Sequence, residues 1–364
     1  MLFSVSFVSK ALSILTFGLT CVSSLPLKNG DYGTHENHDG ICKNPRVRKE
    51  WRKLSDPEKA DYLRAVDCLH SIPGQYADVI DGLSVFEDYI YVHKIQTPYV
   101  HLVGHFLPWH RYFMWTYEED LRNRCGYKGA QPYWDYSLDV PPTAEVTGLS
   151  ASPIFSPDTG FGGDGQYSND SSLPGLDLPK GTGGGCVTDG PFVDWTIHIG
   201  RNTTQIRDDR CLQRSLNPTI ANDWCNANVE AEIMAQKDFG WMHHVLEGEP
   251  SYVKMGVHGG GHFAVGGSAS DVFTANTEPL FYLHHTNLDR MWWQWAMADQ
   301  ENRVWDISGP IAPWSDIMAP NRTGLPTGNV TLEFELGLGR LADMIEVADL
   351  MDTEGDFLCY IYEL

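Results

Sequence analysis

The clearest amphipathic pattern in the chain follows Pro108. A helix can begin at this residue, because proline is tolerated in a first helical turn and strongly disfavoured in a helix interior. Four later residues fall at spacings of four, three and four and therefore share one helical face: His110, Met114, Tyr117 and Leu121. The surrounding positions are rich in aromatic residues. The pattern predicts a helix that begins at Pro108, ends near Gly126 and carries His110 on its buried face.

Two other stretches upstream of position 108 also have helical spacing. Charged and apolar residues alternate in this way between positions 44 and 69, where Ser55 and Asp56 can cap a second helix before Pro57. We expect most charges of this stretch to lie on solvated helical faces. Residues 81–93 predict a further helix that ends at His93.

Downstream, histidines again occur at helical spacing. His258 and His262 are four residues apart, which places both imidazoles on one face of a helix. Pro279 can start another helix, one face of which carries His285, Leu288, Asp289 and Trp292. Residues 140–190, rich in Gly, Pro, Ser and Asp, show neither helical nor strand periodicity, and we interpret them as a long loop tied down by Cys186.

These histidine groups together predict a metal site. A lone buried histidine is satisfied by a backbone carbonyl and a water. Two helix pairs that each direct histidines inward instead describe a metal centre in the core of a helical bundle. We therefore expect a mainly α protein, an antiparallel four-helix bundle with long irregular loops.

The order of the motifs resembles a known family. The pattern H(x7)H(x8)H with FLPWHR around its third histidine, then HxxxH, then LHHxNxDRxWxxW, is similar to the tyrosinase, catechol oxidase and hemocyanin group of coupled dinuclear copper proteins. The resemblance covers roughly residues 42–362. It implies two copper ions, one held by His93, His101 and His110 and the other by His258, His262 and His285.

The resemblance also separates ligands from neighbouring histidines. His285 is preferred over His284 because the family's ligand lies four residues before the aspartate of the DR pair, here Asp289. His105 and His284 are expected to lie beside the ligands without binding metal. His243 and His244 are expected to be structural.

The ligand chemistry agrees with copper. Three neutral imidazoles per ion, with no carboxylate, favour a copper that cycles between oxidation states. A zinc hydrolase is the alternative, and its helix would normally read HExxH with a glutamate beside the first histidine. Gly259 occupies that position here.

Composition excludes one class of function and indicates the number of domains. The formal charge of −22 argues against nucleic acid, because phosphate binding needs a basic face. A hydrophobic content of 42% with 12 Trp is ample for one large core. The metal pattern spans the chain, so we predict one catalytic domain over residues 25–364.

The first 24 residues have the features of a secretory signal peptide. They contain Lys10, an apolar run too short for a bilayer, which needs roughly 20 residues, and small residues before a potential cut. No later segment is long enough to span a membrane. Sequons at Asn169, Asn202, Asn321 and Asn329 modestly support passage through a glycosylating pathway, and we expect a secreted protein.

Cysteine usage fits an oxidising compartment. Removal of the signal peptide takes Cys21 and leaves seven cysteines, enough for up to three disulfides and one thiol, with the connectivity open. In many fungal members of the family, a cysteine two residues before the second histidine is cross-linked to an imidazole. Tyr99 stands there in this chain, so we expect no thioether.

The family pattern also indicates residues that assist catalysis. Members that hydroxylate monophenols often carry asparagine after the first histidine of the second site, together with a glutamate that takes the phenolic proton. Glu249 matches the glutamate, whereas Gly259 does not match the asparagine. Three glycines at positions 259–261 weaken the local helix by roughly 1 kcal/mol each and are expected to leave space over the second copper. Phe281 and Asp289 could orient His285.

The C-terminal residues Tyr360 and Tyr362 resemble the Y-x-Y motif that ends the family's catalytic core, with Arg48 as the expected partner. We expect no C-terminal domain covering the copper site. The predicted function is oxidation of o-diphenols to o-quinones by dioxygen, with hydroxylation of monophenols left open. The alternative is a hemocyanin-like reversible dioxygen carrier. The sequence leaves the physiological phenol and the oligomeric state open.

Overall fold

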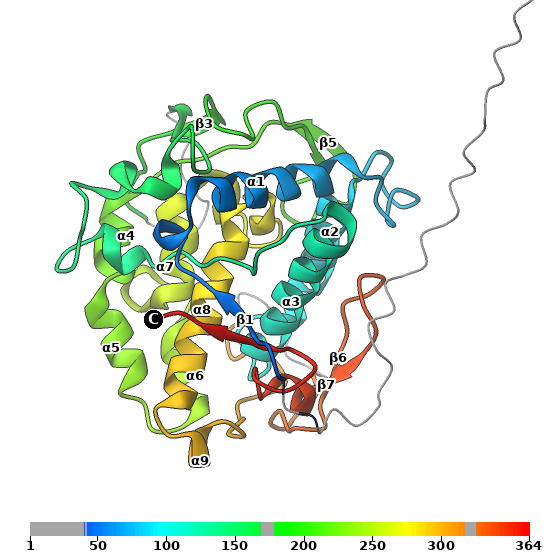
Figure 1. Cartoon of the computed structure of the whole chain (residues 1–364), viewed down its shortest axis with the longest axis vertical. Helices are drawn as coiled ribbons and strands as arrows, with labels where there is room; N and C mark the ends of the chain where they lie inside the picture. The colour runs from blue at the N-terminus through cyan, green and yellow to red at the C-terminus, as the bar shows by residue number, and fades with distance from the viewer. Residues whose placement is uncertain (1–39, 41, 169–177, 317–324) are drawn as a thin grey trace, which may run out of the picture. The chain divides into compact units, whose positions relative to one another are not determined.

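The computed structural model describes residues 40, 42–168, 178–316 and 325–364 (Figure 1). The predicted signal peptide and the sequons at Asn169 and Asn321 lie outside these residues. Asn202 and Asn329 are described, and both are exposed. Among the described residues, no helix is both long enough and apolar enough to cross a membrane.

Four helices form the centre of the fold and carry or flank the histidines: α2 (Val85–Val100), α3 (Phe106–Cys125), α7 (Gly256–Val265) and α8 (Leu280–Met297). Helix α3 packs against both α2 and α8, and α8 also packs against α7 (Figure 1). The predicted mainly α fold with a helical core around the histidines is confirmed. The helices around this core are α1 (Asp56–Ser71), α4 (Pro218–Trp224), α5 (Ala227–Met234), α6 (Phe239–Glu247) and α9 (Gln300–Arg303).

The predicted helix boundaries hold where a capping residue fixes them. Helix α1 begins after Ser55, whose backbone N–H donates to the Glu58 carboxylate at 2.7 Å. Helix α3 begins at Phe106, two residues before Pro108. It ends where Gly126 adopts the left-handed conformation at φ 67°, which glycine reaches without steric cost.

Helix α2 differs from its prediction because it does not end at His93. It begins after Ser84, which accepts a hydrogen bond from the Glu87 backbone N–H, and continues past His93 to Val100 with Pro98 inside it. The segment after His93 places Thr97 one turn from His93. The hydroxyl of Thr97 donates to the His93 carbonyl at 2.8 Å.

The prediction of a helix before Ser55 is wrong. Residues Arg46–Arg48 form strand β1, which pairs in parallel with β8 (Tyr360–Tyr362) near the C-terminus (Figure 1). The pairing partner lies more than 300 residues away, so no local pattern could reveal it. Arg48 and Glu50 are buried here, whereas Lys43 and Lys53 are exposed as expected.

The predicted loop at residues 140–190 is confirmed for its described part. It consists of short 3-10 turns, and β2 pairs with β3 within it. The remaining strands form small two-stranded sheets: β2 (Gly165–Tyr167), β3 (Gly184–Val187), β4 (Ile197–Ile199), β5 (Arg207–Arg210), β6 (Glu335–Leu336) and β7 (Ile345–Glu346).

Disulfides tie distant parts of the chain together. The pairs in the described part of the chain are Cys42–Cys359, Cys68–Cys125 and Cys186–Cys211, and Cys225 is a buried free thiol. This matches the predicted three bridges and one thiol, and the structure supplies the connectivity. The disulfides are compatible with secretion.

Candidate metal centre

The first histidine triad lies between α2 and α3. His93 lies on α2, His101 follows the last residue of that helix, and His110 lies in α3. Each Nδ1 donates to a backbone carbonyl: His93 to Phe273 at 3.1 Å, His101 to Thr97 at 3.0 Å and His110 to Phe106 at 2.9 Å. These hydrogen bonds fix the tautomer and leave each Nε2 with a free lone pair.

The Nε2 atoms of this triad are suited to hold a metal. Those of His93 and His110 are buried and have no hydrogen-bond partner among the described residues. Burial lowers the pKa of His93 to about 4 and that of His101 to about 3, so the imidazoles stay neutral at physiological pH. The ligating atoms of the three rings lie within 4.8 Å of one another. Buried neutral nitrogens without a partner fit a copper ion.

The second triad lies between α7 and α8. His258 and His262 occupy one face of α7, as predicted, and His285 lies on α8. The Nε2 of His262 lies 3.1 Å from that of His258 and 3.2 Å from that of His285. Burial lowers the pKa of all three well below the ordinary value. Three lone pairs that converge in this way also fit a copper ion.

The two triads meet, so the histidines from distant parts of the chain form one centre. The rings of His110 and His285 stack with centroids 4.3 Å apart and an angle of 15° between their planes. The rings of His101 and His258 lie 5.7 Å apart.

His284 belongs to the same cluster by distance but points differently from His285. Its Nε2 donates to the His258 backbone carbonyl at 3.0 Å, and its ring packs against the backbone of α7 at Gly261. Its Nδ1 is buried and has no partner among the residues that the structure describes. The geometry favours a supporting role for His284, although the unpartnered Nδ1 makes it the alternative ligand to His285.

Other histidines near the triads have backbone or carboxylate partners. The Nε2 of His105 donates to the Tyr99 carbonyl at 3.0 Å. The Nε2 of His243 lies 3.0 Å from Glu247 Oε2. His244 is half-buried between Trp241 and Trp314. All three lie outside the two groups of ligating atoms.

Phe281 lies where the sequence predicted. Its ring centroid is 4.1 Å from that of His285 and 5.2 Å from that of His93, so it packs against a histidine of each triad. This contact restricts the orientation of both imidazoles.

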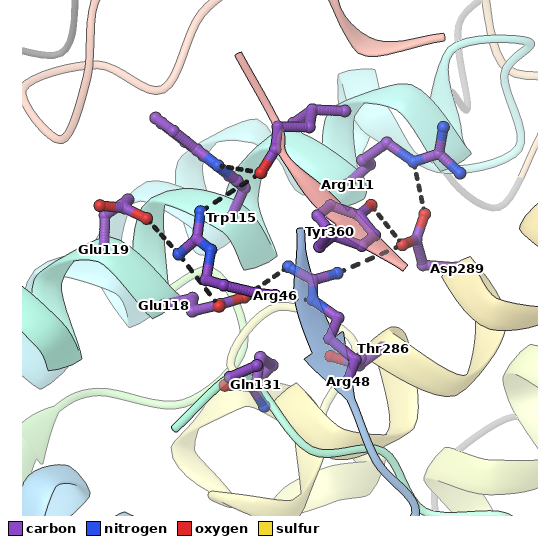
Figure 2. A network of polar contacts seen from close by, with 12 residues as sticks. Arg46, Arg48, Arg111, Trp115, Glu118, Glu119, Gln131, Thr286, Asp289 and Tyr360 are labelled. Atoms are coloured by element: carbon purple, nitrogen blue, oxygen red, sulfur yellow. Dashed lines mark hydrogen bonds and ion pairs between the residues drawn. The ribbon is translucent and has the colours of Figure 1, made fainter. Parts of the chain in front are cut away.

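The Nδ1 of His285 has no hydrogen-bond partner among the described residues, so the expected role of Asp289 in orienting that ring is wrong. The carboxylate instead accepts hydrogen bonds from Arg111 Nε at 2.5 Å, Arg48 Nη1 at 3.3 Å and the Tyr360 hydroxyl (Figure 2). The Tyr362 hydroxyl also donates to it. Arg48 also binds Glu118 at 2.7 Å, and its guanidinium lies over the Tyr360 ring at 3.5 Å. The predicted pairing of Arg48 with the two tyrosines is thus present. The network joins the strands β1 and β8 to the helices α3 and α8, which carry His110 and His285.

The glycines at 259–261 have different surroundings. An added Cβ at Gly260 would meet Trp224 and Cys225, and one at Gly261 would meet the His284 ring at 2.3 Å. These two glycines let α7 pack closely against the neighbouring side chains. The prediction had instead given them the role of leaving space over the metal. Gly259 lines the cavity beside the histidines, and a Cβ there would meet the Met255 side chain.

A cavity of about 110 Å³ opens onto His93, His101, His258 and His262. Glu249, predicted to be catalytic, lies at its rim, where its carboxylate pairs with Lys254 at 3.1 Å and its side chain is 39% exposed. Glu247 was not predicted, although it also lines this cavity. It is buried, and it accepts a hydrogen bond from the Leu102 backbone N–H at 2.6 Å.

Glu247 and His243 form a buried pair behind the first triad. Burial raises the pKa of Glu247 well above its ordinary value and lowers that of His243 to about 3. In both cases the cause is that burial disfavours the charged form of the group. In the sequence, Glu247 follows His243 by four residues on α6, and this spacing is the one signal that could have indicated the pair.

Comparisons with known proteins agree with this geometry. Residues 83–298, more than half of the chain, match the family model described as the common central domain of tyrosinase. The tyrosinase-like protein phomQ1' of Diaporthe leptostromiformis is 33% identical over 96% of this chain and 88% of that protein. Tyrosinase P of Aspergillus terreus is 31% identical over 88% of this chain and 93% of that protein.

A solved structure also matches with high coverage. It is a glycine-to-asparagine mutant of polyphenol oxidase from Thermothelomyces thermophila, 30% identical, with a TM-score of 0.76 and coverage of 88% of this chain and 89% of that chain. A helical core that brings two histidine triads together defines a dinuclear copper oxidoreductase with phenols as its substrate class. The chain belongs to the tyrosinase family.

Proposed function

We propose that this protein oxidises o-diphenols to o-quinones with dioxygen, so that two catechols and one O₂ give two quinones and two waters. The observation that carries the proposal is the convergence of two buried, neutral histidine triads on one cavity. His93, His101 and His110 would hold one copper ion, and His258, His262 and His285 the other. Bound copper supplies the redox chemistry that passes electrons from the phenol to dioxygen.

The residues of the chain account for binding and orientation. The cavity that would admit the ring is lined by His262, Phe263 and Val272. Phe281 and the carbonyl partners of the first triad hold the imidazoles in place.

Monophenols need one more step than catechols, because the phenolic proton must leave at a pKa near 10. Glu249 at the rim is paired with Lys254, and the buried Glu247 is paired with His243, so neither carboxylate is an unpaired base. Gly259 provides no side-chain amide. We therefore propose diphenol oxidation as the main activity.

Oxygen uptake by the copper-loaded protein tests this function. We expect rapid uptake with 4-methylcatechol and at least about tenfold slower uptake with the matching monophenol, p-cresol, since proton removal contributes about 10²–10⁴-fold when a positioned base assists it. Uptake with neither phenol, together with an absorption band that appears and disappears reversibly with dioxygen, would favour the carrier instead.

Replacing Gly259 by asparagine should raise the ratio of monophenol to diphenol activity. The Asn amide would enter the cavity beside His258 and could orient a water that takes the phenolic proton. Met255 must move to make room. Gly259→Leu is the matched control, because leucine has nearly the same size and no amide. Oxygen-uptake rates on p-cresol and 4-methylcatechol give the ratio, and an equal ratio in both variants would contradict the role of the amide.

A further inference from the structure

The lining of the copper cavity differs sharply between its histidine end and its mouth. Away from the histidines the cavity is lined by apolar and small residues: Leu102, Pro250, Met255, Phe263, Val272 and Ala275. No lysine or arginine belongs to the lining within the described residues. Val272 stands at the opening, with 38% of its surface exposed.

The size of the cavity decides which part of a substrate meets this mouth. A volume of about 110 Å³ is somewhat smaller than the roughly 150 Å³ of an apolar protein cavity that holds benzene. One phenol ring therefore fills it. Because the hydroxyl end must face the histidines, where the metal charge also attracts it, a substituent para to the hydroxyl points outward.

The charges near the mouth are mainly acidic. Glu249 lies at the rim, and Lys254, the cation beside it, is already paired with that carboxylate at 3.1 Å. His244 Nε2 lies 4.0 Å from the same carboxylate. A neighbouring hollow shares Glu249 and is lined by Trp314 and Asp316. Among the described residues that line the two hollows, a carboxylate that enters here meets an apolar wall and the carboxylate of Glu249, and no lysine or arginine.

We infer that this enzyme discriminates against phenols with an anionic substituent and takes those whose para substituent is neutral or cationic. An anionic group at the mouth loses hydration against the apolar wall without gaining a counter-charge. Like charges placed side by side oppose binding further. Phenylacetic-acid catechols are thus poor substrates, and simple alkyl or amine-bearing catechols are good ones. This inference rests on the proposed function.

Three catechols that differ mainly in the charge of the para substituent test the inference: 4-methylcatechol, dopamine and 3,4-dihydroxyphenylacetate. We expect kcat/KM for the first two to exceed that for the third by at least about tenfold. The gap should narrow with added salt, because exposed charges are screened. A ratio below threefold would overturn the inference.

Val272→Lys places a cation at the mouth, and Val272→Met is the control with a side chain of similar length and no charge. We expect the lysine variant to raise the relative kcat/KM for 3,4-dihydroxyphenylacetate several-fold and the methionine variant to leave it unchanged. An equal effect of the two variants would show that shape and not charge governs the selectivity, and would also overturn the inference.

Binding measured without turnover separates this inference from the proposed function. Calorimetry under anaerobic conditions, on the copper-loaded protein with its copper reduced to Cu(I) so that no oxidant is present, compares 4-methylcatechol with 3,4-dihydroxyphenylacetate directly. Tighter binding of the neutral catechol supports the inference even if no catechol is oxidised, a result that would reject the proposed function alone. Equal binding overturns the inference whether or not oxidation occurs.

Discussion

Replacing His285 by alanine is expected to lower the copper content from two ions per chain to about one and to reduce catechol oxidation by more than about 100-fold. Loss of residues that merely support a ligand typically costs 10–100-fold in metal affinity or activity, and loss of the ligand itself should cost more. The Nε2 of His285 lies 3.2 Å from that of His262, in the group of lone pairs that we assign to the second ion. Metal analysis by mass spectrometry and oxygen uptake measure the two effects.

His284→Gln is the matched comparison for this prediction. The glutamine amide can still donate to the His258 carbonyl, which the His284 ring does at 3.0 Å. We expect this variant to retain two copper ions and to lose no more than about tenfold in activity. If His284→Gln loses copper and His285→Ala keeps it, the ligand is His284, bound through the Nδ1 that has no partner among the described residues.

The second large effect is expected for Asp289→Asn, which should lower the free energy of unfolding by roughly 3–5 kcal/mol. Removing one partner from a buried ion pair leaves an uncompensated charge, and this is the usual magnitude of that change. Arg111, which is 2% exposed, has Asp289 as its carboxylate partner at 2.5 Å, whereas Arg48 would keep Glu118 (Figure 2). Urea unfolding of the metal-free protein measures the difference.

Asp61→Asn provides the control for Asp289→Asn. Asp61 pairs with Arg64 at 2.6 Å on the surface of α1, where the two side chains are 28% and 51% exposed. An exposed pair of this kind contributes about 0–1 kcal/mol. Equal losses in the two variants would contradict the assignment of the Asp289 network as a main stabilising contact.

The dependence of this network on pH follows from the pKa of Asp289. Burial by itself would raise that pKa, but Arg111 and Arg48 outweigh burial and hold it below its ordinary value. A depressed carboxyl pKa contributes stability that is complete above the unfolded pKa, about 4, and is lost as the pH falls through the folded value. The contribution of Asp289 should therefore be constant at neutral pH and disappear only in acid.

The histidine motifs were readable from the sequence because each depends on local spacing. His258 and His262 are four residues apart on one helix, and FLPWHR starts the helix that carries His110. Hydrophobic periodicity and capping residues fix such helices within a few residues of the chain. Ser55 and Gly126, which bound α1 and α3, were predicted for the same reason.

Features that depend on distant partners were misread or missed. Arg46 and Arg48 looked like solvated helical charges, whereas they form a strand that pairs with the C-terminus. Asp289 lies one turn after His285, yet it binds Arg111 and Arg48. Burial and long-range pairing decide these cases, and neither is visible in a short window of sequence.

The amino-acid sequence by itself indicated the class of this protein, since the order and spacing of the histidine motifs place six imidazoles on or next to helices, and Gly259 stands where a zinc hydrolase carries its glutamate. The tertiary structure decided how those imidazoles are used. The stacking of His110 on His285, the hydrogen bond from His93 Nδ1 to the Phe273 carbonyl, and the absence of lysine and arginine from the cavity lining within the described residues arise from contacts between distant segments. Spacing along a helix specifies which face a residue shares, but only packing specifies what that face meets.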